Sequence, residues 1–222
     1  MSASSTVWQG AGRRIHMQEV GTRDGLQMEQ AFVPTEEKIA LVNALSNAGL
    51  SKIEVTSFTS PTAIPALRDA EIVMREITRL PGTVYTALVP NLRGAERAIE
   101  ARTDELNLVM SASETHNISN LRMTREQSFA SLAQVVATAQ AAQVAVSVSL
   151  SCVFGCPMEG NVHASAVFDW VQRFADLGVR GITLCDTTGM AFPTQVHQLT
   201  TAARARWPGM DFTLHFHNTR GM

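Results

Sequence analysis

The sequence predicts an α/β fold of the TIM (β/α)₈-barrel type, and three observations lead to this prediction. Short apolar, β-rich runs recur along the chain, and helical patterns follow them. Strands that alternate with helices imply a parallel sheet with right-handed crossovers. The number of strand candidates favours a barrel over a short open sheet. The expected strands cover residues 14–20, 51–58, 83–89, 104–110, 144–150, 180–186 and 211–217.

Helical periodicity is clearest in three of the connecting segments. In residues 34–50 the apolar side chains recur every three or four positions, and Gly49 is suited to end the helix. The same pattern appears in residues 128–143 and 164–179. A doubly wound open sheet would share this rhythm, and periodicity alone does not exclude it. No glycine-rich dinucleotide fingerprint follows the first strand, which disfavours that alternative.

The length of the chain predicts one domain that lacks part of a barrel. A complete barrel has eight strands and about 250 residues, whereas this chain has 222 residues and ends just after the seventh strand candidate. We therefore expect the eighth unit and the C-terminal region to be absent from it. Residues 1–13 are expected to form a flexible polar tail, and residues 14–222 an incomplete barrel domain.

Composition excludes several classes of protein. The net charge is −2 and 17% of residues are charged, so no general field attracts nucleic acid or an anionic membrane. No apolar run is long enough for a signal peptide or a membrane span. Cys152, Cys156 and Cys185 are too few for a secreted disulfide framework, so we expect a cytoplasmic protein. Cys152 and Cys156 are expected to pack a loop, and Cys185 to fill the core.

The segment His215-Phe216-His217 is the sharpest local signal. Residues two apart on a strand point to the same face, so both imidazoles can bind one divalent cation. A hydrogen-bonded histidine pair without metal is the alternative. Asp24 can add a carboxylate, because the seventh strand lies near the first in a barrel. Two histidines and one aspartate leave coordination positions open and suit Mg²⁺, Mn²⁺, Co²⁺ or Zn²⁺.

Further charged residues collect at the ends of the strand candidates, where barrels hold their active sites. Arg23 can offer a fixed cationic fork to an enolate oxygen, although an ordinary surface salt bridge with Asp24 is the alternative. Glu54 lies inside an apolar strand and needs a partner, for which Arg23 is the candidate. A purely structural ion pair remains open. Asp186 is either an outer partner of a histidine or of Arg23, or a helix cap with Thr187.

Several motifs together resemble the 3-hydroxy-3-methylglutaryl-CoA lyase family. The arginine–aspartate–glycine loop and the HxH pair identify only a wider group of metal-dependent barrel enzymes. The segments SFTSP, PNLRG and CxxGCPxEG point to the lyase branch. The matching segments are residues 19–27, 53–61, 89–94, 111–115, 151–160, 184–189 and 215–221.

The resemblance implies a cation, Mg²⁺ or Mn²⁺, bound by Asp24, His215 and His217. It also implies that Arg23 stabilises an enolate, with Glu54 and Asp186 in support. In this family a fourth ligand, an asparagine, and a cysteine on a glycine-rich loop follow at positions beyond Met222. The residues that the resemblance places against an acyl-CoA substrate are Gln27, Ser57, Ser113 and Thr183.

The implied reaction is a retro-Claisen cleavage that yields acetyl-CoA and acetoacetate. A homo-oligomer is expected. Gln30, Asn218 and the segment 219–221 depart from the usual family pattern, so another 3-hydroxyacyl-CoA substrate is open. A synthase that condenses a 2-oxo acid with acetyl-CoA is one alternative, and a non-catalytic truncated fragment is another.

Overall fold

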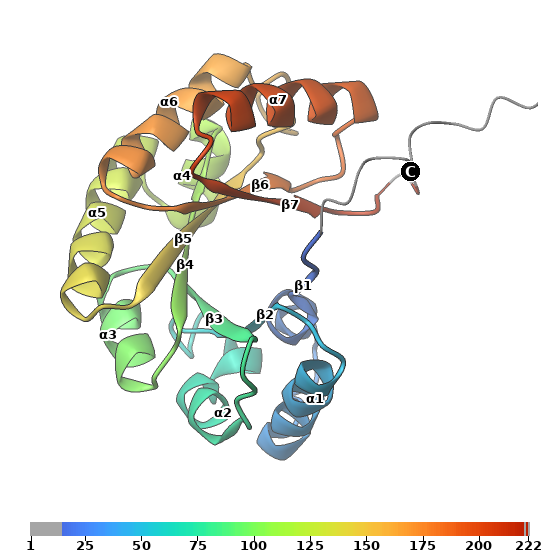
Figure 1. Ribbon diagram of the computed structural model, residues 1–222, viewed down its shortest axis with the longest axis vertical. Helices are drawn as coiled ribbons and strands as arrows, with labels where there is room; N and C mark the ends of the chain where they lie inside the picture. Colours follow the sequence, from blue (N-terminus) through green and yellow to red (C-terminus); the bar gives the residue numbers. More distant parts are fainter. Residues whose placement is uncertain (1–14, 220, 222) are drawn as a thin grey trace, which may run out of the picture.

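A seven-stranded parallel sheet runs through the protein in sequence order. The computed structural model describes residues 15–219 and 221, and its strands pair in the order β1 to β7 without reversal. A doubly wound sheet would reverse its order, so that alternative is wrong. The sheet curls into an open arc, which confirms the predicted barrel type (Figure 1). The strands are β1 Gln18–Glu19, β2 Lys52–Ser57, β3 Val84–Val89, β4 Glu105–Ser111, β5 Ala145–Ser151, β6 Gly181–Asp186 and β7 Asp211–Phe216.

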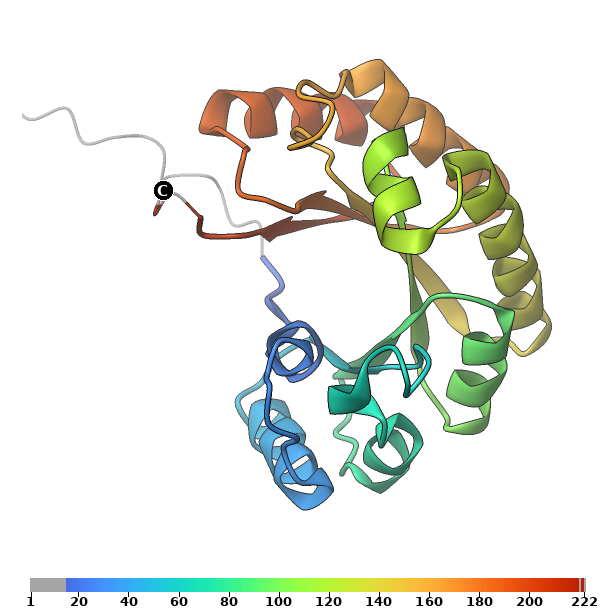
Figure 2. The same ribbon diagram turned by 180° about the vertical axis from the view of Figure 1, so that it is seen from behind.

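Helices cover the convex side of the arc (Figures 1 and 2). The helices predicted in 34–50, 128–143 and 164–179 are present as α1, α5 and α6. A capping box between Thr124 and Gln127 fixes the start of α5. Within the described part of the chain, no helix combines the length and hydropathy needed to cross a membrane. The helices are α1 Thr35–Asn47, α2 Ala70–Glu76, α3 Leu92–Glu100, α4 Glu114–Leu121, α5 Arg125–Ala141, α6 Ala164–Asp176 and α7 Pro193–Arg206.

Alternation along the strands separates an apolar outer face from a polar inner face. Successive side chains point to opposite sides of a sheet. The outward residues are buried under the helices and form the core, among them Ile53, Leu106, Leu108, Val148, Leu150 and Leu184. The inward residues bond to one another across strands, among them Lys52, Glu54, Glu105, Asn107, Ser147 and Ser149. The inside of the arc is therefore lined with groups suited to chemistry.

The strands β1 and β7 form the two edges of the sheet and face each other across the opening of the arc (Figures 1 and 2). The Gln18 amide donates to the Thr213 hydroxyl across this opening, at 3.1 Å. The first strand was predicted at 14–20. In the structure β1 comprises only Gln18–Glu19, the two residues that pair with β2. Residue 14 and the predicted tail lie outside the described residues.

The thiols are buried, which gives a direct test of the fold. Cys152 and Cys156 are fully enclosed, which confirms the loop packing predicted for them. Burial raises the pKa of Cys152 to about 11 and that of Cys185 to about 12. Burial would raise the pKa of Cys156 as well, but hydrogen bonds to its sulfur outweigh burial and lower the pKa. One of these hydrogen bonds is donated by the Ser113 hydroxyl.

We expect an aromatic disulfide reagent at mildly alkaline pH to leave all three cysteines unlabelled in the native protein, because only an accessible thiolate reacts. Release of the chromophore should become rapid after unfolding in guanidinium. Labelling of the native protein at the unfolded rate would contradict this packing.

Candidate active site

Asp24, His215 and His217 converge at the opening of the arc. The Nε2 atoms of both histidines lie 3.7 Å from Asp24 Oδ2, and the three donor atoms fall within 4.8 Å of one another. His215 lies on β7, and His217 follows two residues later, so both rings leave the strand on the same side. The rings stack with centroids 4.8 Å apart. The structure thus brings together the residues that the sequence singled out as ligands.

The electrostatics and hydrogen bonding of the histidines suit metal binding. Burial lowers the pKa of His215 against the opposing pull of Asp24, and His217 lowers it further, which favours the neutral imidazole. His217 Nδ1 lies 3.0 Å from the backbone carbonyl of Asp186. When Nδ1 donates this bond, the Nε2 lone pair faces Asp24. Two imidazole nitrogens and one carboxylate oxygen fit a divalent cation.

The Arg23 side chain is held by two carboxylates. It lies in the π-helix η2 Gly21–Gly25, where the Val20 carbonyl accepts from the backbone N–H of Asp24 at 2.6 Å. Its guanidinium contacts Asp24 Oδ1 at 2.6 Å and Glu54 Oε2 at 3.2 Å. The Thr22 hydroxyl donates to the Glu54 carbonyl at 2.8 Å, which ties η2 to β2. A single turn therefore positions the arginine and the aspartate together.

Burial makes this cluster different from a surface salt bridge. Arg23 is 8% exposed and Glu54 is 4% exposed, so the alternative of an ordinary surface loop is wrong. Burial alone would lower the pKa of Arg23, but Glu54 and Asp24 outweigh it and raise the pKa. Among the described residues, no group accepts a hydrogen bond from the buried Arg23 Nε. Arg23 is therefore a fixed, buried cation and not a mobile surface side chain.

Asp186 supports the site differently from the prediction. Its carboxylate accepts from the backbone N–H groups of Met190 and Ala191, at 2.7 and 3.1 Å, and so closes the turn after β6. Gly189 in this turn has φ +69°, and a Cβ there would lie 2.9 Å from the His217 carbonyl. The contact between Asp186 and the candidate ligand His217 therefore runs through the Asp186 backbone carbonyl instead of its side chain.

Cys185 is buried, as predicted, and it lies on the polar inner face of the sheet beside Glu54 and Arg23. Its pKa is raised first by burial and then by the charge of Glu54, while the nearby Arg23 lowers it. The thiol is therefore neutral and fills space beside the ion pairs. Alternation along β6 put it there, since its neighbours Leu184 and Asp186 point outward.

The predicted substrate residues lie in or after four different strands, β1, β2, β4 and β6. The Ser57 hydroxyl bonds the Thr59 hydroxyl at 2.7 Å. The Ser113 hydroxyl donates to the Cys156 sulfur at 3.0 Å and caps α4. Thr183 of β6 pairs in register with Thr213 of β7. Gln27 lines a cavity.

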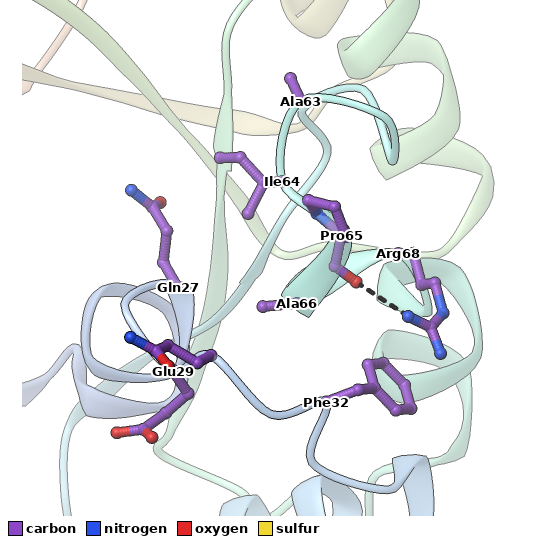
Figure 3. Close-up of a pocket in the computed structure, with 9 residues that line it drawn as sticks. Gln27, Glu29, Phe32, Ala63, Ile64, Pro65, Ala66 and Arg68 are labelled. Carbon is purple, nitrogen blue, oxygen red and sulfur yellow. Dashed lines mark hydrogen bonds between the residues drawn. The ribbon is translucent and has the colours of Figure 1, made fainter.

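That cavity lies directly after η2. Side chains from the segments 27–32 and 63–68 line it, and Figure 3 shows Gln27 and Ile64 extending into the space between them. The Arg68 guanidinium stacks 3.7 Å from the centroid of the Phe32 ring, and Lys38 Nζ lies 4.2 Å from the same centroid. The lining of the cavity thus includes both the Gln27 amide and the cationic Arg68.

Sequence reasoning missed Thr22, Asn107 and Ser149. All three bond to Glu54 or to a group that bonds to it. An asparagine in the middle of the apolar run Glu105–Ser111, in phase with Glu105, was an available signal for Asn107. A lone serine or threonine gave no comparable signal.

The comparison with known proteins agrees with this geometry. A family model described as HMGL-like matches residues 14–222. The chain belongs to the HMGL-like family. The family, the barrel fold and the class of lyase enzymes predicted from the sequence are thereby confirmed.

Relatives within the HMGL-like family are lyases by name. Hydroxymethylglutaryl-CoA lyase YngG of Bacillus subtilis is 45% identical over 209 residues, which are 94% of this chain and 70% of that protein. The crystal structure of the B. subtilis HMG-CoA lyase matches with a TM-score of 0.91, covering 95% of this chain and 70% of that one. An HMG-CoA lyase from A. baumannii, in complex with coenzyme A and 3-methylmalate, is 49% identical with a TM-score of 0.87, covering 92% and 67%.

Proposed function

We propose that this chain carries the active site of a divalent-cation-dependent carbon–carbon lyase. Its substrate is 3-hydroxy-3-methylglutaryl-CoA or a closely related 3-hydroxyacyl-CoA, and its products are acetyl-CoA and acetoacetate or another oxo acid. The observation that supports this most is the convergence of Arg23 on the cluster of Asp24, His215 and His217. A cationic group beside a cation site is what cleavage to an enolate requires.

The residues divide the work of the reaction. Asp24, His215 and His217 would hold Mg²⁺ or Mn²⁺, which supplies acidification of the substrate hydroxyl and a template for its oxygens. Asp24 is the candidate acceptor of the hydroxyl proton. The adjacent carbon–carbon bond then breaks, and its electron pair stays on the acetyl-CoA fragment as an enolate, while the hydroxyl carbon becomes a ketone. Arg23 stabilises the enolate oxygen, and the enolate carbon takes up one proton to give acetyl-CoA.

We propose that the chain binds its substrate in part through the coenzyme A moiety. The A. baumannii relative is described with coenzyme A and with 3-methylmalate, a branched hydroxy acid. In this chain the cavity that follows η2 is lined by Gln27 and the cationic Arg68 (Figure 3). Ser57, Ser113 and Thr183 are proposed to border the acyl group. Cytoplasmic location and homo-oligomeric assembly stay predictions.

The test is release of acetyl-CoA from 3-hydroxy-3-methylglutaryl-CoA by protein expressed from the full coding sequence. We expect release with Mg²⁺ or Mn²⁺ and none with EDTA. His217→Ala should weaken Mn²⁺ binding in calorimetry at least about tenfold, since loss of even an outer-shell partner has that effect. His197→Ala is the matched control, because His197 is exposed on α7 and should leave both readouts unchanged.

Three results would overturn the proposal. Acetyl-CoA release that persists in EDTA would remove the role of the cation. Release of free CoA thiol from acetyl-CoA and a 2-oxo acid, with no cleavage of any 3-hydroxyacyl-CoA, would favour the condensing synthase. Absence of both reactions despite bound metal would favour the non-catalytic alternative.

A further inference from the structure

A chain of hydrogen bonds crosses the inside of the arc from β5 to the arginine. The Ser149 hydroxyl donates to Asn107 Oδ1 at 2.9 Å, and Asn107 Nδ2 donates to Glu54 Oε1 at 3.0 Å. The other oxygen of the same carboxylate, Oε2, receives the Arg23 guanidinium at 3.2 Å. The four residues come from β5, β4, β2 and η2, so the contacts link three strands to the catalytic turn. We call this set the Glu54 relay: Arg23, Glu54, Asn107 and Ser149.

The Glu54 relay has a defined direction. An ionised carboxylate only accepts hydrogen bonds, so Asn107 must present its NH₂ group to Glu54. The amide would serve equally well in the flipped orientation unless its oxygen were held elsewhere. The Ser149 hydroxyl holds it by donating to Oδ1. Both oxygens of Glu54 are then engaged, one by Asn107 and one by Arg23, and the carboxylate has no freedom to turn away.

Burial makes the relay consequential. Asn107 and Glu54 are both buried, and hydrogen bonds to a charged group in such surroundings are stronger than those between neutral groups. Arg23 has two carboxylate partners, Asp24 and Glu54. If Glu54 moved, only Asp24 would hold the guanidinium, which would no longer be fixed in one orientation.

We propose that Asn107 and Ser149 are positioning residues, which fix Glu54 so that Arg23 is held for the developing enolate. This inference rests on the proposed lyase function. Among the described hydrogen bonds, neither Asn107 nor Ser149 contacts a donor atom of Asp24, His215 or His217. Substitution of Asn107 or Ser149 should therefore change the rate of bond cleavage and not the affinity for the cation.

The experiment compares kcat, KM and Mn²⁺ affinity in a series of variants. Asn107→Leu should lower kcat about 10- to 100-fold, the factor that corresponds to loss of a hydrogen bond to a buried charge. Asn107→Asp, which sets a second carboxylate against Glu54, should lower it at least as far. Ser149→Ala should lower kcat about threefold to tenfold, since it removes only the bond that orients the amide. KM and Mn²⁺ affinity should stay near their starting values.

The neighbouring layer of the barrel supplies the matched control. Ser147 lies two residues before Ser149 on the same face of β5, but its hydroxyl donates to Glu105, at 2.7 Å. Glu105 in turn pairs with Lys52 and not with Arg23. Ser147→Ala thus removes a similar hydrogen bond from a serine hydroxyl, but this bond leads to Lys52 and not to Arg23. The variant should leave kcat unchanged.

A double-mutant cycle tests whether the serine acts through the asparagine. Once Asn107→Leu is in place, Ser149→Ala should have no further effect on kcat. Full additivity of the two losses, or an effect of Asn107→Leu no larger than that of Ser147→Ala, would overturn the proposal.

A second readout separates this inference from the proposed function. In nitrogen NMR the Arg23 side chain should show slow rotation of its guanidinium in the starting protein and faster rotation in Asn107→Leu. If the starting protein cleaves no acyl-CoA, the lyase proposal fails, and restriction of Arg23 still reports on the relay. Equal rotation in both proteins would overturn the relay whatever the reaction.

Discussion

Arg23→Gln is expected to lower kcat about 100- to 1,000-fold, the loss typical of removing one donor to a developing oxyanion. The guanidinium is buried, fixed by Asp24 and Glu54, and keeps an unpaired Nε–H among the described groups. In the proposed reaction such a cation would stabilise the enolate without reorganising at the moment of bond cleavage. Steady-state cleavage of 3-hydroxy-3-methylglutaryl-CoA measures the effect, and KM should change much less than kcat.

Arg23→Lys separates charge from geometry. An ammonium group keeps the charge but cannot span two carboxylates as a planar fork does, so a large part of the loss should remain. Arg180→Gln, at an exposed position before β6, is the matched control and should keep full activity. Thermal unfolding of each variant shows whether it is folded. A folded Arg23→Gln protein with kcat close to the starting value would contradict the assigned role.

Lys38→Met is expected to lower the free energy of unfolding by about 3 to 5 kcal/mol, because removing one partner of a buried ion pair leaves the other uncompensated. Lys38 is 3% exposed and Asp69 is 8% exposed. Lys38 Nζ lies 2.6 Å from both Asp69 Oδ1 and the Ala66 carbonyl. These bonds tie α1 to the segment that lines the cavity beside η2. Guanidinium denaturation measures the loss as a lower midpoint.

The double variant Lys38→Met with Asp69→Leu should regain much of the lost stability, since replacing both partners with apolar groups removes the stranded charge. Arg75→Met is the control. Arg75 forms an exposed pair with Glu100, and its loss should cost less than about 1 kcal/mol. If Lys38→Met and Arg75→Met shifted the midpoint equally, the buried Lys38 pair would contribute no more to stability than the exposed Arg75 pair.

The fold was largely predictable because one feature of the strands repeats. Apolar outward residues and following helical segments define β2 to β7 in the sequence, and the observed strands begin within a residue or so of the expected ones. The first strand was the exception. Its pairing depends on a single neighbour, and a local pattern in 14–20 does not report how far that neighbour extends. Edge strands are set by tertiary contacts more than by their own sequence.

The candidate site was predictable where short spacing fixes direction. The histidines two residues apart and the adjacent Arg23 and Asp24 could be read locally. The π-helical turn that carries Arg23 could not, because it depends on the Thr22 bond to β2. The same limit applies to Asp186, whose carboxylate has two backbone N–H partners within its own turn. Which hydrogen-bond partner each of these side chains contacts is decided only when the strands come together in the folded protein.

The proposed cation ligands come from opposite edges of the sheet, one after β1 and two at β7. A bound cation would therefore hold the two edges of the sheet together across the opening of the arc. Contacts between such distant parts of a chain form late in folding, since loop closure has to precede them. Cation affinity thus reports whether the arc has closed. Added Mn²⁺ should shift the unfolding midpoint in proportion to the logarithm of its concentration.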